Sequence, residues 1–205
     1  DPTAQTGLKA AFPGKDIFMT ECEGGDSSTI IGVMQNWGRS SIDWNIALDE
    51  NHGPHLGGCG SCNGTVTVNS ATKAVTYNDQ YRDIEHFAKF VPTGATHIAS
   101  TVDTNSSKGA PLTTVAFANP DRSTTLVALN TGTTTQTFTV VYGTHSFDAT
   151  LPGNDVDVPQ LYSEFTVQGN LVFGLVLIIS GVLRRRRPPL WWWTSPSNDC
   201  VSAAR

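Results

Sequence analysis

The chain has 205 residues, of which 39% are hydrophobic and 15% are charged, and its formal net charge is −5. These values exclude a long disordered tail, a collagen-like fibre and a coiled coil. A mildly acidic chain without a basic stripe is poorly suited to a phosphate backbone, so we expect no nucleic-acid partner. Frequent glycine, proline and threonine favour strands and turns over a helical bundle.

Two of the four cysteines stand close together, as Cys59-Gly-Ser-Cys62. A zinc site would need two more ligands, which His52 and His55 could supply, but this spacing differs from the common zinc patterns. We therefore expect a short disulfide between Cys59 and Cys62 and no bound metal.

The compartment follows from the cysteine pair and from two N-glycosylation triplets, which begin at Asn63 and Asn105. Together these features favour a secreted protein. The chain starts at Asp1 without an initiator methionine or an apolar leader, so we expect a piece of a longer or processed protein.

Residues 1–91 alternate between strand and helix signals, which is typical of a parallel α/β sheet. In chain order we expect a strand at 15–20, N-cap residues at 26–28, a helix at 29–37, a strand at 41–48, a glycine-rich loop at 51–63, a strand at 65–68 and a helix at 78–90. The last helix would place Ile84, Phe87 and Phe90 on one face.

Residues 92–157 have a different pattern, in which short threonine-rich strands alternate with turn signals. The expected strands are 96–101, 113–118, 124–129 and 137–142. Strands at this spacing predict an antiparallel sandwich or small barrel.

Residues 158–205 do not fit either neighbour. The uncharged run 171–183 is followed by four arginines, 184–187. As a helix the run would span roughly 20 Å, against about 30 Å for the hydrocarbon core of a bilayer. The alternatives are a membrane anchor and a tail outside the folded unit, for instance one translated from a misread gene boundary, and we favour the tail.

The candidate catalytic residue is Glu21, at the C-terminal end of the first apolar strand and before a glycine-rich loop. Barrel enzymes keep catalytic groups at this end of their strands. A surface or helix-capping glutamate is the plainer reading of this position alone. Trp44 and Asn45 end the next strand and suit a sugar site, since a ring stacks on C–H groups and an amide bonds hydroxyls.

These residues belong to an ordered series of motifs over about 80 residues. The series comprises Phe18-Met-Thr-Glu21-Cys, Asn36-Trp37, Asp43-Trp-Asn-Ile-Ala-Leu48, Gly53-Pro-His55, 57–68 and Tyr81-Arg-Asp-Ile-Glu-His86 with the residues to Gly94. The series resembles glycoside hydrolase family 30, the group of glucosylceramidases and endo-β-1,6-glucanases.

The resemblance implies the C-terminal part of a (β/α)8 TIM barrel, strands 7 and 8, followed by an antiparallel β-sandwich. It implies hydrolysis of β-glucosides such as glucosylceramide or β-1,6-glucan with retention and without a cofactor. Glu21 is then the nucleophile, with Glu23 as the fallback. Trp44 and Asn45 line the sugar site, and His55 reaches it from the next loop.

The chain also departs from the family pattern. The family's acid/base glutamate follows an asparagine upstream of the nucleophile, and the residues before Glu21 contain no such motif. The segment from Glu21 to Trp44 is shorter than in the family, and Arg82 and Glu85 replace a tyrosine and a glycine. We therefore expect the isolated chain to be inactive without the N-terminal remainder of the barrel.

Two other functions compete with this interpretation. The sandwich at 92–157 would serve as a non-catalytic module that binds carbohydrate or a partner. Alternatively, the run 171–183 would hold the chain at a membrane as an anchored stub.

Overall fold

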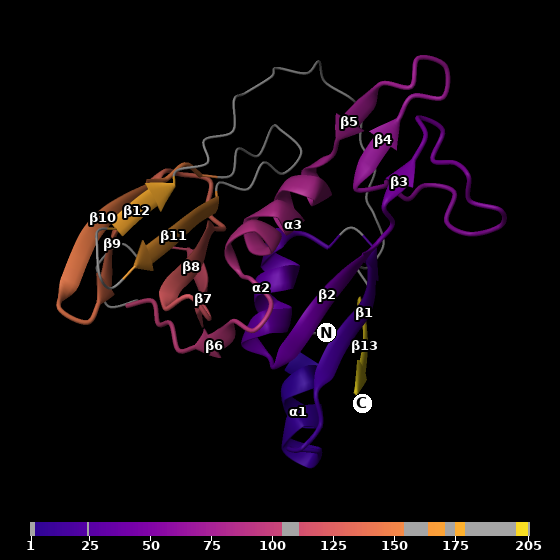
Figure 1. Ribbon diagram of the computed structural model, residues 1–205. Helices are drawn as coiled ribbons and strands as arrows, with labels where there is room; N and C mark the ends of the chain where they lie inside the picture. The colour runs from indigo at the N-terminus through magenta and orange to yellow at the C-terminus, as the bar shows by residue number, and fades with distance from the viewer. Residues whose placement is uncertain are drawn as a thin grey trace. The chain divides into compact units, whose positions relative to one another are not determined.

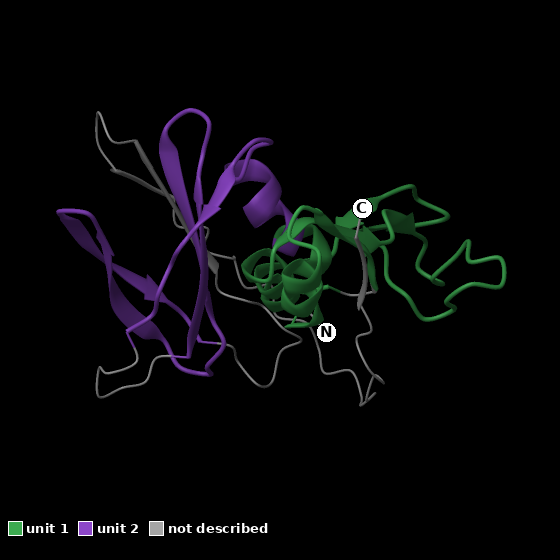
Figure 2. Ribbon diagram, turned by 90° about the horizontal axis from the view of Figure 1, so that it is seen from below, with its two compact units in different colours: residues 1–82, 182–205 green, residues 83–181 purple. Residues whose placement is uncertain are grey.

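The computed structural model describes residues 3–23, 25–103, 111–153, 164–170, 175–178 and 200–204. The chain forms two compact units (Figures 1 and 2). Unit 1 comprises residues 1–82 and 182–205, and unit 2 comprises residues 83–181.

The first sheet of unit 1 is built around a parallel strand pair. Helix α1 (Thr3–Ala11), which the sequence pattern did not predict, precedes strand β1 (Ile17–Glu23). Helix α2 (Ser27–Gln35) then connects β1 to β2 (Gly38–Trp44), and the two strands pair in parallel. This is the pairing that the strand–helix–strand alternation predicts. Strand β13 (Cys200–Ala204) pairs antiparallel with the other edge of β1, so the sheet order is β13-β1-β2 (Figure 1).

The ends of α2 follow from its sequence. Asp26 is the N-cap, and its side chain accepts a hydrogen bond of 2.8 Å from the backbone N–H of Thr29. The helix stops at Gln35 rather than at Trp37, because Trp37 has a φ of +74° that no α-helix accommodates. Val33 on its inner face packs against Met19 and Cys22 of β1.

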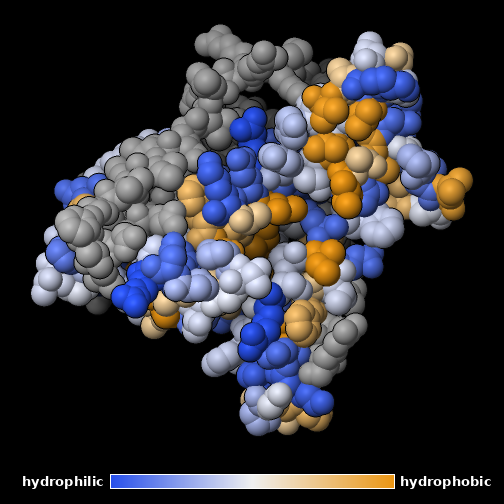
Figure 3. Space-filling model, in the orientation of Figure 1, coloured by the Kyte–Doolittle hydropathy of each residue, from blue (hydrophilic) through white to orange (hydrophobic). Residues whose placement is uncertain are grey.

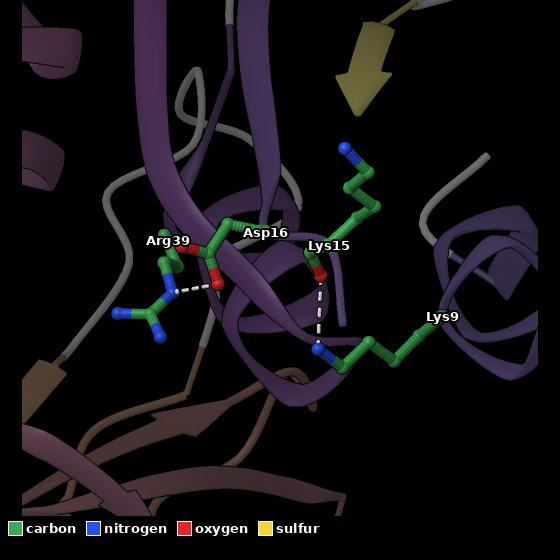
Figure 4. A network of polar contacts seen from close by, with 4 residues as sticks. All are labelled: Lys9, Lys15, Asp16 and Arg39. Carbon is green, nitrogen blue, oxygen red and sulfur yellow. Dashed lines mark hydrogen bonds and ion pairs between the residues drawn. The ribbon is translucent and has the colours of Figure 1, made fainter. Parts of the chain in front are cut away.

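Charged residues lie at the N-terminal ends of the two parallel strands. Arg39 Nε and Asp16 Oδ1 are 2.6 Å apart, and Lys9 Nζ donates a hydrogen bond of 2.9 Å to the Lys15 carbonyl (Figure 4). Both partners of the ion pair are largely exposed, so the pair contributes about 0–1 kcal/mol to stability.

The expected strand 41–48 is divided in two. After β2 the carbonyl of Asn45 accepts hydrogen bonds from the N–H and the hydroxyl of Thr65. The chain therefore leaves β1 and continues as β3 (Ala47–Leu48), which pairs in parallel with β4 (Val66–Val68). Strand β5 (Val75–Tyr77) completes this sheet as an antiparallel hairpin with β4.

Helix α3 (Asp79–Phe90) follows β5 and begins within one residue of its expected start. Phe87 and Phe90 are buried, as the predicted apolar face requires, and Ile84 is partly buried. The carbonyl of Phe90 accepts a hydrogen bond of 2.7 Å from the Thr125 hydroxyl, which ties the end of α3 to the sheet of unit 2.

The larger sheet of unit 2 has the strand order β12-β11-β8-β7-β6, with antiparallel pairs throughout. Its strands are β6 (Thr96–Ile98), β7 (Leu112–Ala118), β8 (Ser123–Asn130), β11 (Glu164–Asn170) and β12 (Leu175–Ile178).

The second sheet is the hairpin of β9 (Gln136–Tyr142) and β10 (His145–Leu151). Its inner side packs on the larger sheet, because Ala128 of β8 shares one core cluster with Ala149 and Leu151 of β10. Partly buried side chains from both sheets complete the cluster, namely Leu112, Leu126, Phe138 and Phe147. Unit 2 is therefore the antiparallel sandwich that the sequence predicts.

The stretch 158–205 contributes β11, β12 and β13 where the structure describes it. Of the uncharged run 171–183, only Leu175–Ile178 is described, and these residues form a strand. The arginines 184–187 and the triplet at Asn105 lie outside the described residues. In the described part of the chain, no helix has the length and apolar character needed to cross a bilayer.

Candidate active site

Glu21 lies near the C-terminal end of β1, on the face that turns away from α2. The register between β1 and β2 shifts between Met19 and Cys22, so that both of these residues are buried against α2. Because neighbouring side chains of a strand point to opposite faces, Glu21 lies on the open face, where it is exposed. Among the described residues, no hydrogen bond or ion pair engages the carboxylate of Glu21.

Trp44 joins Glu21 on this open face. Asp43 of β2 lies opposite Cys22 of β1, and Trp44 lies opposite Glu23. The side chain of Trp44 is therefore on the Glu21 side of the sheet, and 46% of its surface is exposed. The structure thus brings the predicted nucleophile and the predicted sugar-stacking ring to one end and one face of two neighbouring strands.

Asn45 directly follows Trp44, and its side chain has one unused hydrogen-bonding atom. Its backbone carbonyl is occupied by Thr65, as described above. Its side-chain Oδ1 is buried and has no partner within the part of the chain that the structure describes. A buried oxygen without a donor costs free energy, so this atom is an unsatisfied acceptor beside Trp44.

His55 is placed differently from the other predicted site residues. It is exposed in the loop 51–63, where its ring lies beside Gly60. Asp49 holds the start of this loop by accepting hydrogen bonds from the N–H groups of Asn51 and Gly53. In the described residues, no hydrogen bond links His55 to Glu21 or Trp44.

The same loop contains the expected disulfide. Cys59 and Cys62 are bonded, with their Cα atoms 5.5 Å apart, which confirms that prediction. The carbonyl of Cys62 lies 3.0 Å from Nδ1 of His52. Within the described ranges, no three histidine, cysteine, aspartate or glutamate side chains are grouped as a metal site would need.

Asp43 is the polar residue of this region whose role the sequence pattern did not identify. Its pKa is raised to about 6, mainly by burial and to a smaller extent by the nearby Asp26, while the N–H groups of Gly25 and Trp44 act in the opposite direction. The sequence feature that could have identified Asp43 is its position directly before Trp44 at a strand end. A carboxylate with a perturbed pKa at such an end marks a functional candidate.

Exposed apolar side chains gather beside the candidate site, over the β3–β5 sheet (Figure 3). Val75 and Tyr77 are each more than half exposed. The ring of Tyr77 lies 4.5 Å from that of Tyr81, centroid to centroid.

Comparison with known proteins finds one matching family model and several similar proteins. The family model of the glycosyl hydrolase family 30 beta sandwich domain matches residues 94–154. An endo-1,6-β-D-glucanase of Trichoderma harzianum is 35% identical over 140 residues, which cover 64% of this chain and 28% of that protein. An endo-1,6-β-D-glucanase of Aspergillus fumigatus is 34% identical over 128 residues, with coverages of 58% and 26%.

A solved structure of an endo-β-1,6-glucanase resembles this chain with a TM-score of 0.67 and 29% identity. The match covers 75% of this chain and 37% of that one. The chain spans about a quarter of the length of the curated relatives that it matches.

Proposed function

Because the chain belongs to glycoside hydrolase family 30, we propose that it is part of a retaining β-glycosidase and supplies the nucleophile, Glu21. The observation that carries this proposal is the placement of Glu21 and Trp44 on one open face, at the C-terminal ends of two parallel strands. In α/β barrels the active site is assembled at that end of the strands.

We propose further that β1 and β2 are strands 7 and 8 of a (β/α)8 barrel. The parallel pairing through α2 supports this assignment, as does the exposure of Ile42 and Trp44 on the face opposite the helix. In a closed barrel that face would be covered by the remaining strands. The N-terminal remainder of the barrel is then the partner that this unit needs for activity.

The substrate that we propose is β-1,6-glucan, with glucosylceramide as the second choice. The endo-β-1,6-glucanases among the relatives support the glucan. The disulfide between Cys59 and Cys62 supports secretion, because such bonds persist in oxidising compartments.

The mechanism follows from the two-carboxylate chemistry of retaining glycosidases. The ionised carboxylate of Glu21 attacks the anomeric carbon, and the glycosidic bond breaks as a second carboxyl group, about 5–5.5 Å away, donates a proton to the leaving oxygen. Water then hydrolyses the glycosyl–Glu21 ester. The ring of Trp44 stacks on the sugar, and the side-chain amide of Asn45 bonds a sugar hydroxyl. His55 would reach the site from the loop 51–63.

The 205-residue chain alone is expected to be inactive, because the proton donor lies in the upstream part of the barrel. Loss of general acid assistance lowers the rate by about 10²–10⁴-fold, and most of the cleft is lost with it.

The binding-module alternative receives less support. A polysaccharide-binding face would need a row of exposed rings. In the described part of the sandwich, Tyr142 is the one aromatic side chain in the exposed class.

An assay of two proteins tests the proposal. We would compare the 205-residue chain with a version extended upstream to a complete barrel, on an aryl β-glucoside, β-1,6-glucan and glucosylceramide. We expect turnover of the glucan by the extended protein alone, with a loss of at least about 10³-fold on Glu21→Gln.

Glu23→Gln is the matched control, two residues further along the same strand, and we expect it to retain turnover. Clear turnover by the 205-residue chain that Glu21→Gln abolishes would contradict the inactivity. Loss of activity in Glu23→Gln but not in Glu21→Gln would contradict the assignment of the nucleophile.

A further inference from the structure

Asp43 links the ends of the two strands that carry the proposed site. It lies on β2 opposite Cys22 of β1, and Cys22 directly follows Glu21 in the chain. Its Oδ1 is 3.3 Å from the backbone nitrogen of Gly25, in the segment that leaves β1. The N–H of Trp44 also stabilises its charged form. This carboxylate therefore contacts the backbone that follows the proposed nucleophile, and it directly precedes the proposed stacking ring in the chain.

The approach of Gly25 to Asp43 depends on the absence of a side chain. A Cβ atom at position 25 would lie 3.3 Å from Sγ of Cys22 and 3.5 Å from Oδ1 of Asp43. The first distance is shorter than an ordinary van der Waals contact between carbon and sulfur, and Cys22 is fully buried. Glycine thus allows the backbone N–H to reach the carboxylate.

The charges around Asp43 are few. The nearby carboxylate of Asp26, the N-cap of α2, repels the charged form of Asp43 and raises its pKa. The nearest basic side chain of these strands, Arg39, pairs with Asp16 at the N-terminal ends. The carboxylate of Asp43 is therefore stabilised by backbone N–H groups rather than by a cation, and such bonds constrain the direction of the backbone more than a surface ion pair does.

We propose that Asp43 is a positioning residue, which holds the segment leaving β1 at Gly25 and the chain at Trp44 so that Glu21 and the stacking ring keep a fixed relative geometry. This inference rests on the proposed function of Glu21. Asp43 lies on the face toward α2, opposite to Glu21, so it acts through the backbone and does not touch the substrate. A displacement of about 1 Å at a reacting group costs on the order of 100-fold in rate, so an anchor at this point matters for catalysis.

The first test uses the 205-residue chain and needs no activity. We would follow the amide signal of Gly25 by ¹⁵N NMR between pH 4 and pH 8 in the wild-type chain. We expect a titration with a midpoint near the pKa of Asp43, about 6, and its disappearance in Asp43→Asn. Asp43→Ala removes the acceptor, and we expect the exchange of the Gly25 amide to accelerate about fivefold or more, whereas Asp43→Asn keeps an acceptor oxygen.

The second test uses the version extended upstream. We expect glycosylation of Glu21 by a 2-fluoro-glucosyl fluoride to slow at least about tenfold in Asp43→Ala, with most of the rate restored in Asp43→Asn at pH 7. Asp16→Ala is the matched control, because it removes a carboxylate from the opposite end of the same strands. We expect it to leave both the Gly25 amide and the labelling rate unchanged.

The outcomes separate this inference from the proposed function. A Gly25 amide that does not titrate, or that is equally protected in Asp43→Ala, overturns the anchor whether or not Glu21 is labelled. Equal labelling rates in Asp43→Ala and the wild type overturn the positioning role. An extended enzyme that is never labelled contradicts the proposed function, and the Gly25 titration still decides whether Asp43 holds this segment.

Discussion

At the scale of single residues, two carboxylates near the end of the β1–β2 pair have opposite surroundings. Glu21 is exposed on the open face, whereas Asp43 is half-buried on the face toward α2. A nucleophile must be ionised to attack. A carboxylate that is partly removed from water favours its neutral form instead, which is why burial raises the pKa of Asp43.

Asp43 makes the stability of the chain depend on pH. Its pKa is about 6 in the folded state, above the ordinary value of 3.8, so the folded state binds the proton more tightly than the unfolded state. The contribution to stability is therefore complete below about pH 4 and is lost as the pH rises through 6. The full shift would correspond to about 3 kcal/mol, and solvent screening at this half-buried site reduces it to about 1 kcal/mol.

Urea unfolding of the wild-type chain and of Asp43→Asn at pH 4, 5, 6 and 7 measures this effect. We expect the free energy of unfolding of the wild type, relative to the variant, to fall by about 1 kcal/mol from pH 4 to pH 7. A constant or rising difference would show that Asp43 does not titrate in this way.

The sequence predicted individual residues where a short pattern was sufficient. The disulfide of Cys59 and Cys62 followed from their spacing, and the N-cap Asp26 from its side-chain chemistry. The link from Asp43 to Gly25 could not be predicted, because these residues are 18 positions apart and meet only through the register of two strands.

At the scale of elements, strand β8 connects the two sheets of the sandwich. It is central in the five-stranded sheet, and its Asn130 is fully buried at the strand's end. The side-chain Nδ2 of Asn130 donates to the carbonyls of Thr134 and Pro152, at 2.9 Å each, and lies 3.3 Å from the carbonyl of Leu151. Its Oδ1 accepts from the N–H of Gly132. This one amide therefore joins β8 to the turn before β9 and to the end of β10.

Asn130→Ala leaves these buried carbonyls without a donor. We expect a loss of about 2–3 kcal/mol in the free energy of unfolding, measured by urea denaturation. Asn130→Asp keeps the volume but removes both donors, so it should destabilise at least as strongly. Gln136→Ala, at a more accessible position of the next strand, is the control and should change stability by less than about 0.5 kcal/mol. Equal effects of Asn130→Ala and Gln136→Ala would contradict the role of Asn130.

The loop 51–63 depends on the disulfide of Cys59 and Cys62. In the chain-entropy model, a loop of this size is stabilised by about 2 kcal/mol. We expect the double variant Cys59→Ala/Cys62→Ala to lose about this amount in urea unfolding. Far-UV circular dichroism should be unchanged, because the bond closes a loop between elements. A variant as stable as the wild type would show that the other loop contacts are sufficient, such as that between His52 and Cys62.

Two helices, α2 and α3, were predicted more successfully than the strand ends, whereas α1 was not predicted. The apolar spacing in α3 and the N-cap of α2 are local signals, and both helices form. The division of the expected strand 41–48 was not predicted, because its cause is a partner 20 residues away, Thr65, which bonds to Asn45. Strand β10 was missed as well, although Phe147, Ala149 and Leu151 alternate with polar residues along it.

At the scale of the whole molecule, the two units were predicted to different extents. The antiparallel sandwich followed from the repeated short strands and is matched by the family model over residues 94–154. For unit 1, the sequence predicted a parallel pair but could not predict the strand on the other edge of β1. The structure has β13 there, from a stretch that we expected to lie outside the folded unit.

The open face of β1 and β2 supports our proposal that activity needs more chain than these 205 residues. We propose that the exposed tryptophan and isoleucine beside a glutamate form one side of the sugar site, and a retaining mechanism needs a second carboxyl group across from the first. We expect this second group to come from the upstream barrel. Extension should therefore restore catalysis and also reduce the exposure of Ile42 and Trp44, which the difference in fluorescence between the protein and its Trp44→Phe variant would report.

Covalent labelling of the extended enzyme is the most direct measurement. A 2-fluoro-glucosyl fluoride forms the glycosyl ester without needing a proton donor, and peptide mass spectrometry then identifies the modified residue. We predict that one label is attached to Glu21 and that Glu21→Gln remains unlabelled. Attachment to Glu23, or to any residue outside β1, would contradict the assignment of Glu21 as the nucleophile.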